Sequence, residues 1–225
     1  MELPYEEQRI KEVVEKYGID VKKLEQEQEK LSKLLVFKDS INFDVAERIA
    51  GIETVFAKNK IISSIVVLQN GELVEQEYFE DKIRFPYIPG LRAYRELPSV
   101  MGAFNKLDEK PDLVFIKDSI HPRKLGMASH FSVIASVPVI GISDSLIVGE
   151  IKDDSIFLND KIVGKVLRPK VGANPIYVSP GNMISLKTSV ELTKKMIKEP
   201  HKFPEPLRLA RKYAKEVLEE VFKSF

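Results

Sequence analysis

A proline-rich aromatic run is the first stretch of this 225-residue chain whose residue types suggest a chemical task. Residues 85–90 read Phe-Pro-Tyr-Ile-Pro-Gly. Pro86 and Pro89 flank Tyr87 and Ile88, so the backbone is stiff and cannot join a central strand. A rigid apolar tip suits insertion between the stacked bases of a nucleic acid. The same residues also suit a stiff connector packed on the core, and both interpretations stay open.

A second run places basic side chains at the predicted start of a helix. Residues 120–130 include His121, Arg123, Lys124 and His130. The free backbone N–H groups at a helix start already favour anions. Positive side chains at the same place therefore suggest that this run binds phosphate.

Alternating secondary structure must position both runs. Segments rich in Val, Ile and Phe predict consecutive antiparallel strands at residues 48–56, 61–69 and 73–79, and Asn70-Gly71 is a strong hairpin signal. The later predicted strands are residues 113–116, 138–142, 156–158, 162–167 and 176–178. The predicted helices are residues 91–107, 124–136, 185–198 and 206–225. This order predicts an α/β fold with a mixed sheet, in which an antiparallel meander is followed by parallel strands, flanked by helices.

Residues 1–38 are predicted to form an N-terminal helical arm, and residues 39–225 the main domain. Glu, Lys, Gln and Leu dominate the arm, while Gly18 and Asp20 indicate a helix end and a new helix cap. Residues 25–30 are all polar, which predicts a partly exposed helix. Packing against the body is one interpretation of the arm, and docking of a protein partner is the other.

Composition excludes several classes of protein and site. The 35 Lys and Arg residues nearly cancel the 34 Asp and Glu residues, so the chain is not a strongly basic DNA clamp. The absence of Cys excludes disulfides, thiolate zinc sites and Cys nucleophiles. His121 and His130 are nine residues apart, which does not support a zinc site on one helix face. The chain has neither a long apolar stretch nor a signal-peptide start, so we expect a cytoplasmic protein without a membrane span.

Several runs taken together resemble the endonuclease V family. The matching stretches, in the family's order, are residues 85–96, 111–130, 137–142, 175–186 and 203–210. The resemblance implies an RNase H-like fold and a nuclease, dependent on magnesium or manganese, that recognises deaminated bases, chiefly inosine, in DNA or RNA. The run at residues 86–89 would be its strand-separating wedge. The residues expected to bind nucleic acid are Pro86, Tyr87, Ile88, Pro89, Gly90, His121, Arg123 and Lys124.

The acidic positions depart from the family's pattern. Metal-dependent cleavage needs clustered carboxylates. Glu53 stands where the family has Asp, Glu96 is kept, and Lys117 stands where the family has Asp. Asp118 follows, but a shift of one residue in a strand turns the side chain to the other face. Asp118 can therefore substitute only if the strand has already ended.

Two of these departures look linked. Lys117 replaces a family Asp and Asp144 replaces a family Lys, at the ends of neighbouring parallel strands. In the last helix, Arg211 replaces a His or Asp. Our hypothesis places the Lys117 ammonium where the metal would lie, balanced by Glu53, Glu96 and Asp144, because buried carboxylates without a cation are costly. The alternative is a coincidence between two mobile loops.

Three functions follow from these residues. The first is a relative that binds nucleic acid through the wedge and the basic helix start, with weakened or lost cleavage. The second is an active endonuclease that holds Mg²⁺ or Mn²⁺ with Glu53, Glu96 and Asp118. The third is a protein-interaction module that works through the N-terminal arm. The near-zero net charge weakens the first unless basic residues gather on one face.

Overall fold

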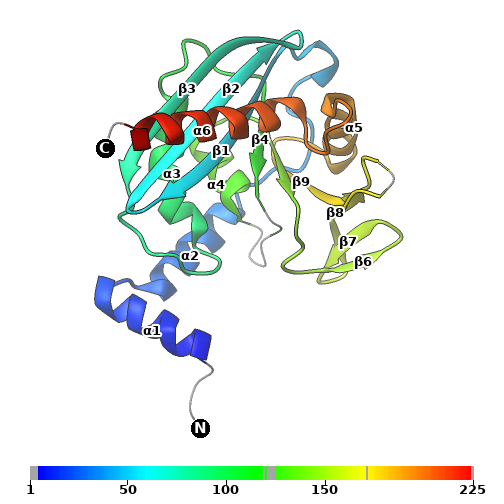
Figure 1. Cartoon of the computed structure of the whole chain (residues 1–225). Helices are drawn as coiled ribbons and strands as arrows, with labels where there is room; N and C mark the ends of the chain where they lie inside the picture. The colour runs from blue at the N-terminus through cyan, green and yellow to red at the C-terminus, as the bar shows by residue number, and fades with distance from the viewer. Residues whose placement is uncertain (1–4, 119, 121–124, 171, 224–225) are drawn as a thin grey trace.

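The structure is a computed structural model that describes residues 5–118, 120, 125–170 and 172–223. Its centre is a nine-stranded sheet with the strand order β3-β2-β1-β4-β5-β9-β8-β7-β6 (Figure 1). The strands are β1 (Arg48–Ala57), β2 (Lys60–Gln69), β3 (Glu72–Lys82), β4 (Leu113–Lys117), β5 (Val139–Ser143), β6 (Glu150–Lys152), β7 (Ser155–Leu158), β8 (Lys161–Leu167) and β9 (Ile176–Asn182). The helical segments are α1 (Tyr5–Tyr17), α2 (Val21–Ser32), η1 (Phe43–Val45), α3 (Arg92–Phe104), α4 (Met127–Ala135), α5 (Leu186–Met196) and α6 (Glu205–Lys223).

The direction of the strands confirms the predicted mixed sheet. β1, β2 and β3 pair antiparallel, and Asn70 and Gly71 take the positive φ angles, 52° and 85°, that the hairpin turn requires. β4 then lies parallel to β1, and β5 lies parallel to β4. The short strand β6 was not predicted, because its three residues are all exposed and carry no apolar pattern.

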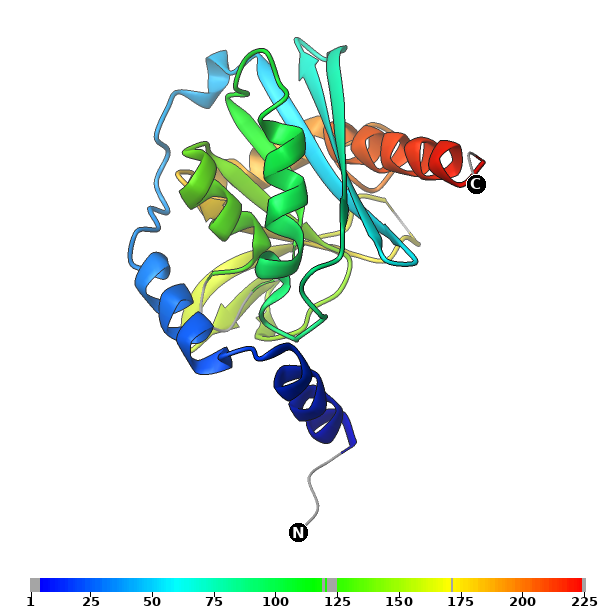
Figure 2. The same cartoon turned by 90° about the vertical axis from the view of Figure 1, so that its left-hand side faces the viewer.

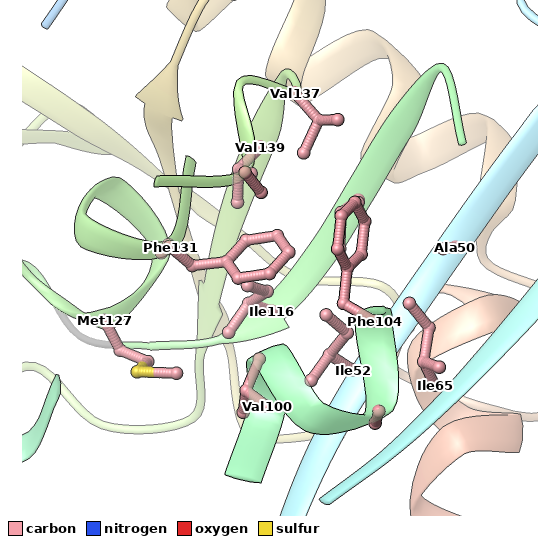
Figure 3. Close-up of a cluster of buried hydrophobic side chains, with 14 of the residues drawn as sticks. Ala50, Ile52, Ile65, Val100, Phe104, Ile116, Met127, Phe131, Val137 and Val139 are labelled. Carbon is pink, nitrogen blue, oxygen red and sulfur yellow. The ribbon is translucent and has the colours of Figure 1, made fainter. Parts of the chain in front are cut away.

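Side-chain alternation along β1 and β4 divides the core between the two faces of the sheet. Ile52 and Ile116 point to the face covered by α3 and α4, where Phe104 and Phe131 pack edge to face with centroids 5.2 Å apart (Figure 3). Phe115 points to the opposite face, which α5 and α6 cover. Residues 53 and 117 therefore belong to the α6 face, and residue 118 belongs to the α4 face.

The start of α6 lies directly against β1. A Cβ atom built on Gly51 would come within 2.2 Å of the carbonyl carbon of Pro206, so no larger residue fits at position 51 without moving α6. This close approach brings the acidic residue two places further along β1, Glu53, under the same helix.

The two N-terminal helices differ in how they meet the body. α1 projects away from the sheet, whereas α2 lies beside the end of the domain that carries α4 (Figures 1 and 2). The segment after α2 is tied to the body, because the N–H of Val36 donates to Asn182 and the N–H of Met183 donates to the carbonyl of Val36. Within the described residues, no helix has the length and apolar character needed to cross a membrane.

Candidate functional site

Glu96, the acidic residue that the chain shares with the family pattern, forms an ion pair with Arg92 on the first turns of α3. Arg92 and Glu96 are four residues apart and lie on the same side of the helix. The guanidinium donates from Nε to Oε1 at 2.6 Å and from Nη2 to Oε2 at 2.8 Å, and Glu96 is only 3% exposed. Burial disfavours the charge of Arg92, but the hydrogen bonds and the charge of Glu96 outweigh it and raise the pKa of Arg92. Both oxygens of Glu96 are therefore already engaged.

A second ion pair joins the two exchanged positions. Lys117 Nζ lies 3.2 Å from Oδ2 of Asp144. Lys117 is paired in register with Ile142, so Asp144, two residues further, lies on the same side of the sheet. Burial would raise the pKa of Asp144, but the hydrogen bond and charge of Lys117 dominate and lower it. The exchange of Lys and Asp thus brings opposite charges into contact.

Glu53 lies beside these pairs and is buried. Ile52 is paired in register with Ile116, which places Glu53 next to Lys117 at the following position. Burial raises the pKa of the Glu53 carboxyl above its ordinary value of 4.5, although the positive charges of Lys117, Arg211 and Arg92 oppose the shift.

The Asp118 carboxylate accepts a hydrogen bond at the start of α4, which is a different role from binding a metal ion. β4 ends at Lys117, and Asp118 lies at the start of α4, where its Oδ2 accepts a hydrogen bond from the Ala128 N–H at 2.8 Å. Its Oδ1 lies 3.9 Å from Nη1 of Arg92. β4 has therefore ended before Asp118, which is the condition under which Asp118 could replace the metal ligand expected at position 117. Its carboxylate nevertheless points to the α4 face of the sheet.

The donor set does not fit a divalent metal ion. Glu96 is held by Arg92, and Asp118 by the start of α4. Across the described residues, no three acidic or histidine side chains lie close enough to hold one ion. Hard cations such as Mg²⁺ need several converging oxygen ligands, and here cations of the chain face those oxygens instead.

The predicted wedge forms a loop just before α3. Tyr87 is 65% exposed and Pro89 is exposed, so this part of the loop is open to a ligand. Ile88 is only 4% exposed, which corrects its predicted place at the tip. Its side chain anchors the loop in the core, and its carbonyl accepts a hydrogen bond from the Leu91 N–H at 3.0 Å. The presented apolar group is therefore Tyr87.

The predicted basic helix start cannot be placed, since His121, Arg123 and Lys124 lie outside the described residues. His130 is described and buried in α4, where its ring meets the Tyr94 ring edge to face with centroids 5.4 Å apart. Burial lowers the pKa of His130. This geometry is that of a packed histidine.

Two residues were missed by reasoning from the sequence. Arg92 is not among the site residues predicted from the sequence, although its spacing of four from Glu96 was the available signal. Gln28 lies in the all-polar stretch of the arm, yet it is buried on the body. No local pattern distinguishes it from its exposed neighbours.

A cavity of about 340 Å³ adjoins the end of β4 and the start of α4. Asp118 and Ser129 supply polar groups to its wall, and Ile162 and Leu186 supply apolar ones. Its size lies at the lower end of the range seen for small-molecule sites.

Comparison with known sequences points to one family. The sequence profile described as Endonuclease V matches residues 29–212. Endonuclease V from Thermosipho melanesiensis is 38% identical over 201 residues, covering 83% of this chain and 86% of the relative. Endonuclease V from Dictyoglomus turgidum is 36% identical over 203 residues, covering 85% and 88%.

Solved structures of similar shape carry the same family name. Endonuclease V from Bacillus subtilis superposes with a TM-score of 0.84 at 24% identity, covering 93% of this chain and 97% of that one. Endonuclease V from Ciona intestinalis, in complex with a 24mer DNA containing an inosine followed by a ribo-adenosine, gives a TM-score of 0.79 at 21% identity and covers 89% and 98%. At these identities the likeness concerns the fold.

Proposed function

Because the chain belongs to the endonuclease V family and has the RNase H-like fold of that family, we propose that it binds deaminated, inosine-containing DNA or RNA and that its cleavage activity is weakened or lost. Its function is endonuclease V-like and directed at nucleic acid. The observation that carries the loss of cleavage is the pairing of the acidic centre with cations of the chain itself, Arg92 with Glu96 and Lys117 with Asp144.

The pairing opposes the chemistry that cleavage would need. In nucleases of this kind a divalent metal ion activates water and stabilises the leaving oxygen. An arriving Mg²⁺ or Mn²⁺ would have to displace a guanidinium from both oxygens of Glu96, and it would meet the ammonium of Lys117 nearby. The metal ion would have to compete with the two hydrogen bonds that Arg92 makes to Glu96, and with the proton on Glu53, whose pKa burial raises.

The proposed binding surface consists of the exposed ring of the proline-rich loop and of the basic residues that precede α4 in the sequence. Tyr87 presents an aromatic ring on a loop stiffened by Pro86 and Pro89, which suits stacking against an unpaired base. Arg123 and Lys124 supply positive charge and His121 a polar ring next to α4 in the sequence, where phosphate would bind.

The cavity beside Asp118 is our candidate pocket for the deaminated base. A base that leaves the stack needs a pocket that reads its edge by hydrogen bonds, and this one combines polar groups with apolar walls. The relative from Ciona intestinalis bound to inosine-containing DNA supports the choice of substrate. The proposal also places the protein in the cytoplasm, in keeping with a chain that has no Cys.

The test compares binding and cleavage on the same substrates. Inosine-containing DNA and RNA are incubated with excess protein in EDTA, in Mg²⁺ and in Mn²⁺, with the matching adenosine substrates as controls. We expect inosine-dependent binding that persists in EDTA, and no nicking under any condition. The variant E53D/R92L/K117D/D144K removes Arg92 and Lys117 and gives positions 53, 117 and 144 the residue types that the family has there, and it should gain Mn²⁺-dependent nicking.

Two outcomes would contradict the proposal. Nicking by the native chain with either metal would show that the protein is an active endonuclease, for which Glu53, Glu96 and Asp118 are the candidate metal ligands. No affinity for any nucleic acid at low salt would instead favour a protein-interaction role through the N-terminal arm.

A further inference from the structure

A buried glutamine connects the arm to the wedge loop. Gln28 lies on α2 among exposed polar residues, yet it is only 1% exposed. Its side-chain Nε2 donates a hydrogen bond to the carbonyl of Gly90 at 2.9 Å. A buried amide is costly unless it is hydrogen-bonded, so this contact holds the side chain at one place on the loop. Gly90 is also the point where the chain turns into α3, with a φ of +79°.

A second contact reaches the other end of the same loop. Tyr94 donates from its hydroxyl to the carbonyl of Leu24 at 3.1 Å. The ring of Tyr94 lies 6.0 Å, centroid to centroid, from that of Phe85, the residue at which the wedge run begins. Leu24 and Gln28 are one helical turn apart on α2, so one face of this helix contacts Gly90 directly and reaches Phe85 through the ring of Tyr94.

The loop between these contacts has a buried part and an exposed part. Ile88 is anchored in the core, but Tyr87 and Pro89 project into solvent. An aromatic group can separate bases only if its loop does not yield when it meets the stack, and preorganised groups bind better than mobile ones. Contacts that hold Gly90 directly and Phe85 through Tyr94 provide that rigidity.

We propose that α2 is a brace that positions the wedge loop, and that Gln28 is its positioning residue. The brace consists of Leu24 and Gln28 on one side and of Gly90 and Tyr94 on the other. Gln28 lies just before the residues 29–212 matched by the family profile, so that match assigns it no role. The effect of the brace on nucleic acid rests on the proposed function, whereas its effect on the loop does not.

The variant that removes the buried amide is Gln28→Met. Methionine has a similar length and fills the same space but has no amide, so a change reports the loss of the polar contacts of Gln28, the hydrogen bond to Gly90 among them, and not an empty cavity. Gln26→Ala is the matched control, because Gln26 is an exposed glutamine on the same helix.

Amide hydrogen exchange measures the brace without nucleic acid. The Leu91 N–H donates to the carbonyl of Ile88 across the end of the loop. We expect its exchange to become about three- to tenfold faster in Gln28→Met, which is the effect of losing one ordinary hydrogen bond. Gln26→Ala should exchange at the native rate. Native exchange at Leu91 in a folded Gln28→Met protein would overturn the brace.

Fluorescence of 2-aminopurine placed next to the inosine in a duplex then measures base separation by the native chain and both variants. At saturating protein we expect a clear rise for the native chain and Gln26→Ala, and a rise at most about half as large for Gln28→Met. The salt dependence of affinity should not change, because no phosphate contact is lost. Faster exchange with an undiminished fluorescence rise would overturn the positioning role. A native chain that binds no substrate would contradict the proposed function, and the exchange measurement would then decide the brace alone.

Discussion

The wedge loop and the acidic centre meet at the first turn of α3, but they differ in what they leave available. At the wedge, polar contacts from α2 hold Gly90 at the end of the loop and Tyr94 on the first turn of α3, and they leave Tyr87 exposed. At the acidic centre, Arg92 and Lys117 contact the carboxylates themselves. Hydrogen bonds and ion pairs therefore leave the Tyr87 side chain exposed in the wedge loop, whereas in the acidic centre they engage the carboxylates. The difference teaches that hydrogen bonds and ion pairs can leave one side chain of a region exposed, as at Tyr87, or occupy the acidic groups of a region, as at Glu96.

The largest expected effect comes from breaking the Arg92–Glu96 pair. Arg92→Leu leaves a buried carboxylate without its partner, and we expect a loss of about 3 kcal/mol in the free energy of unfolding, measured in urea. The control is Arg84→Ala, which removes a mostly exposed guanidinium from Asp81 and should cost less than about 1 kcal/mol. Adding Glu96→Gln to Arg92→Leu should recover part of the loss. Equal small losses for both Arg variants would mean that the acidic centre is not closed by this pair.

The wedge is tested by removing its exposed ring. Tyr87→Ala should weaken binding of inosine-containing duplex by about ten- to a hundredfold, since stacking on one base contributes about 1–3 kcal/mol. The free energy of unfolding should stay near the native value, because the side chain is mostly exposed. Tyr17→Ala, which removes an exposed tyrosine from α1, serves as the control and should leave affinity unchanged. Equal affinities of the native chain, Tyr87→Ala and Tyr17→Ala would show that the exposed ring of Tyr87 does not contact the nucleic acid.

Substitution of Asp118 tests whether this residue stabilises the start of α4 or binds a metal ion. Asp118→Ala removes the acceptor for the Ala128 N–H, and we expect a loss of about 1 kcal/mol in the free energy of unfolding. Asp118→Asn keeps an acceptor and should lose less. If either variant abolished a metal-dependent nicking activity of the native chain, Asp118 would belong to the acidic centre after all.

The smallest effect is the pH dependence carried by Glu53. Because burial raises its pKa above 4.5, the folded chain binds this proton more tightly than the unfolded chain. Stability therefore falls as pH rises from 4.5 through the folded-state pKa. Glu53→Gln removes that fall, so thermal unfolding should match the native chain at pH 4 and occur at a higher temperature at pH 7. A variant less stable than native at pH 7 would show that attraction to Lys117 and Arg211 exceeds the cost of burial.

Much of the fold was predictable because its signals are local. Asn70-Gly71 marked a hairpin whose two turn residues both have positive φ angles, and alternation along β4 correctly separated Asp118 from Lys117. The pattern of apolar segments also indicated the order of strands and helices. The short strand β6 escaped prediction, since pairing with β7 and not burial defines it.

The sequence by itself determined where the proline-rich run lies and that Lys117 and Asp144 stand at the ends of neighbouring strands, and its resemblance to the family predicted which acidic positions differ. Only the tertiary structure decided that Ile88 is buried, that Arg92 holds Glu96 by both oxygens and that Gln28 meets Gly90. The physical reason is the distance along the chain between the residues that interact. Turn conformation and strand alternation depend on adjacent residues, whereas Gln28 and Gly90 are 62 positions apart, and burial or ion pairing at such a distance exists only once the elements have packed.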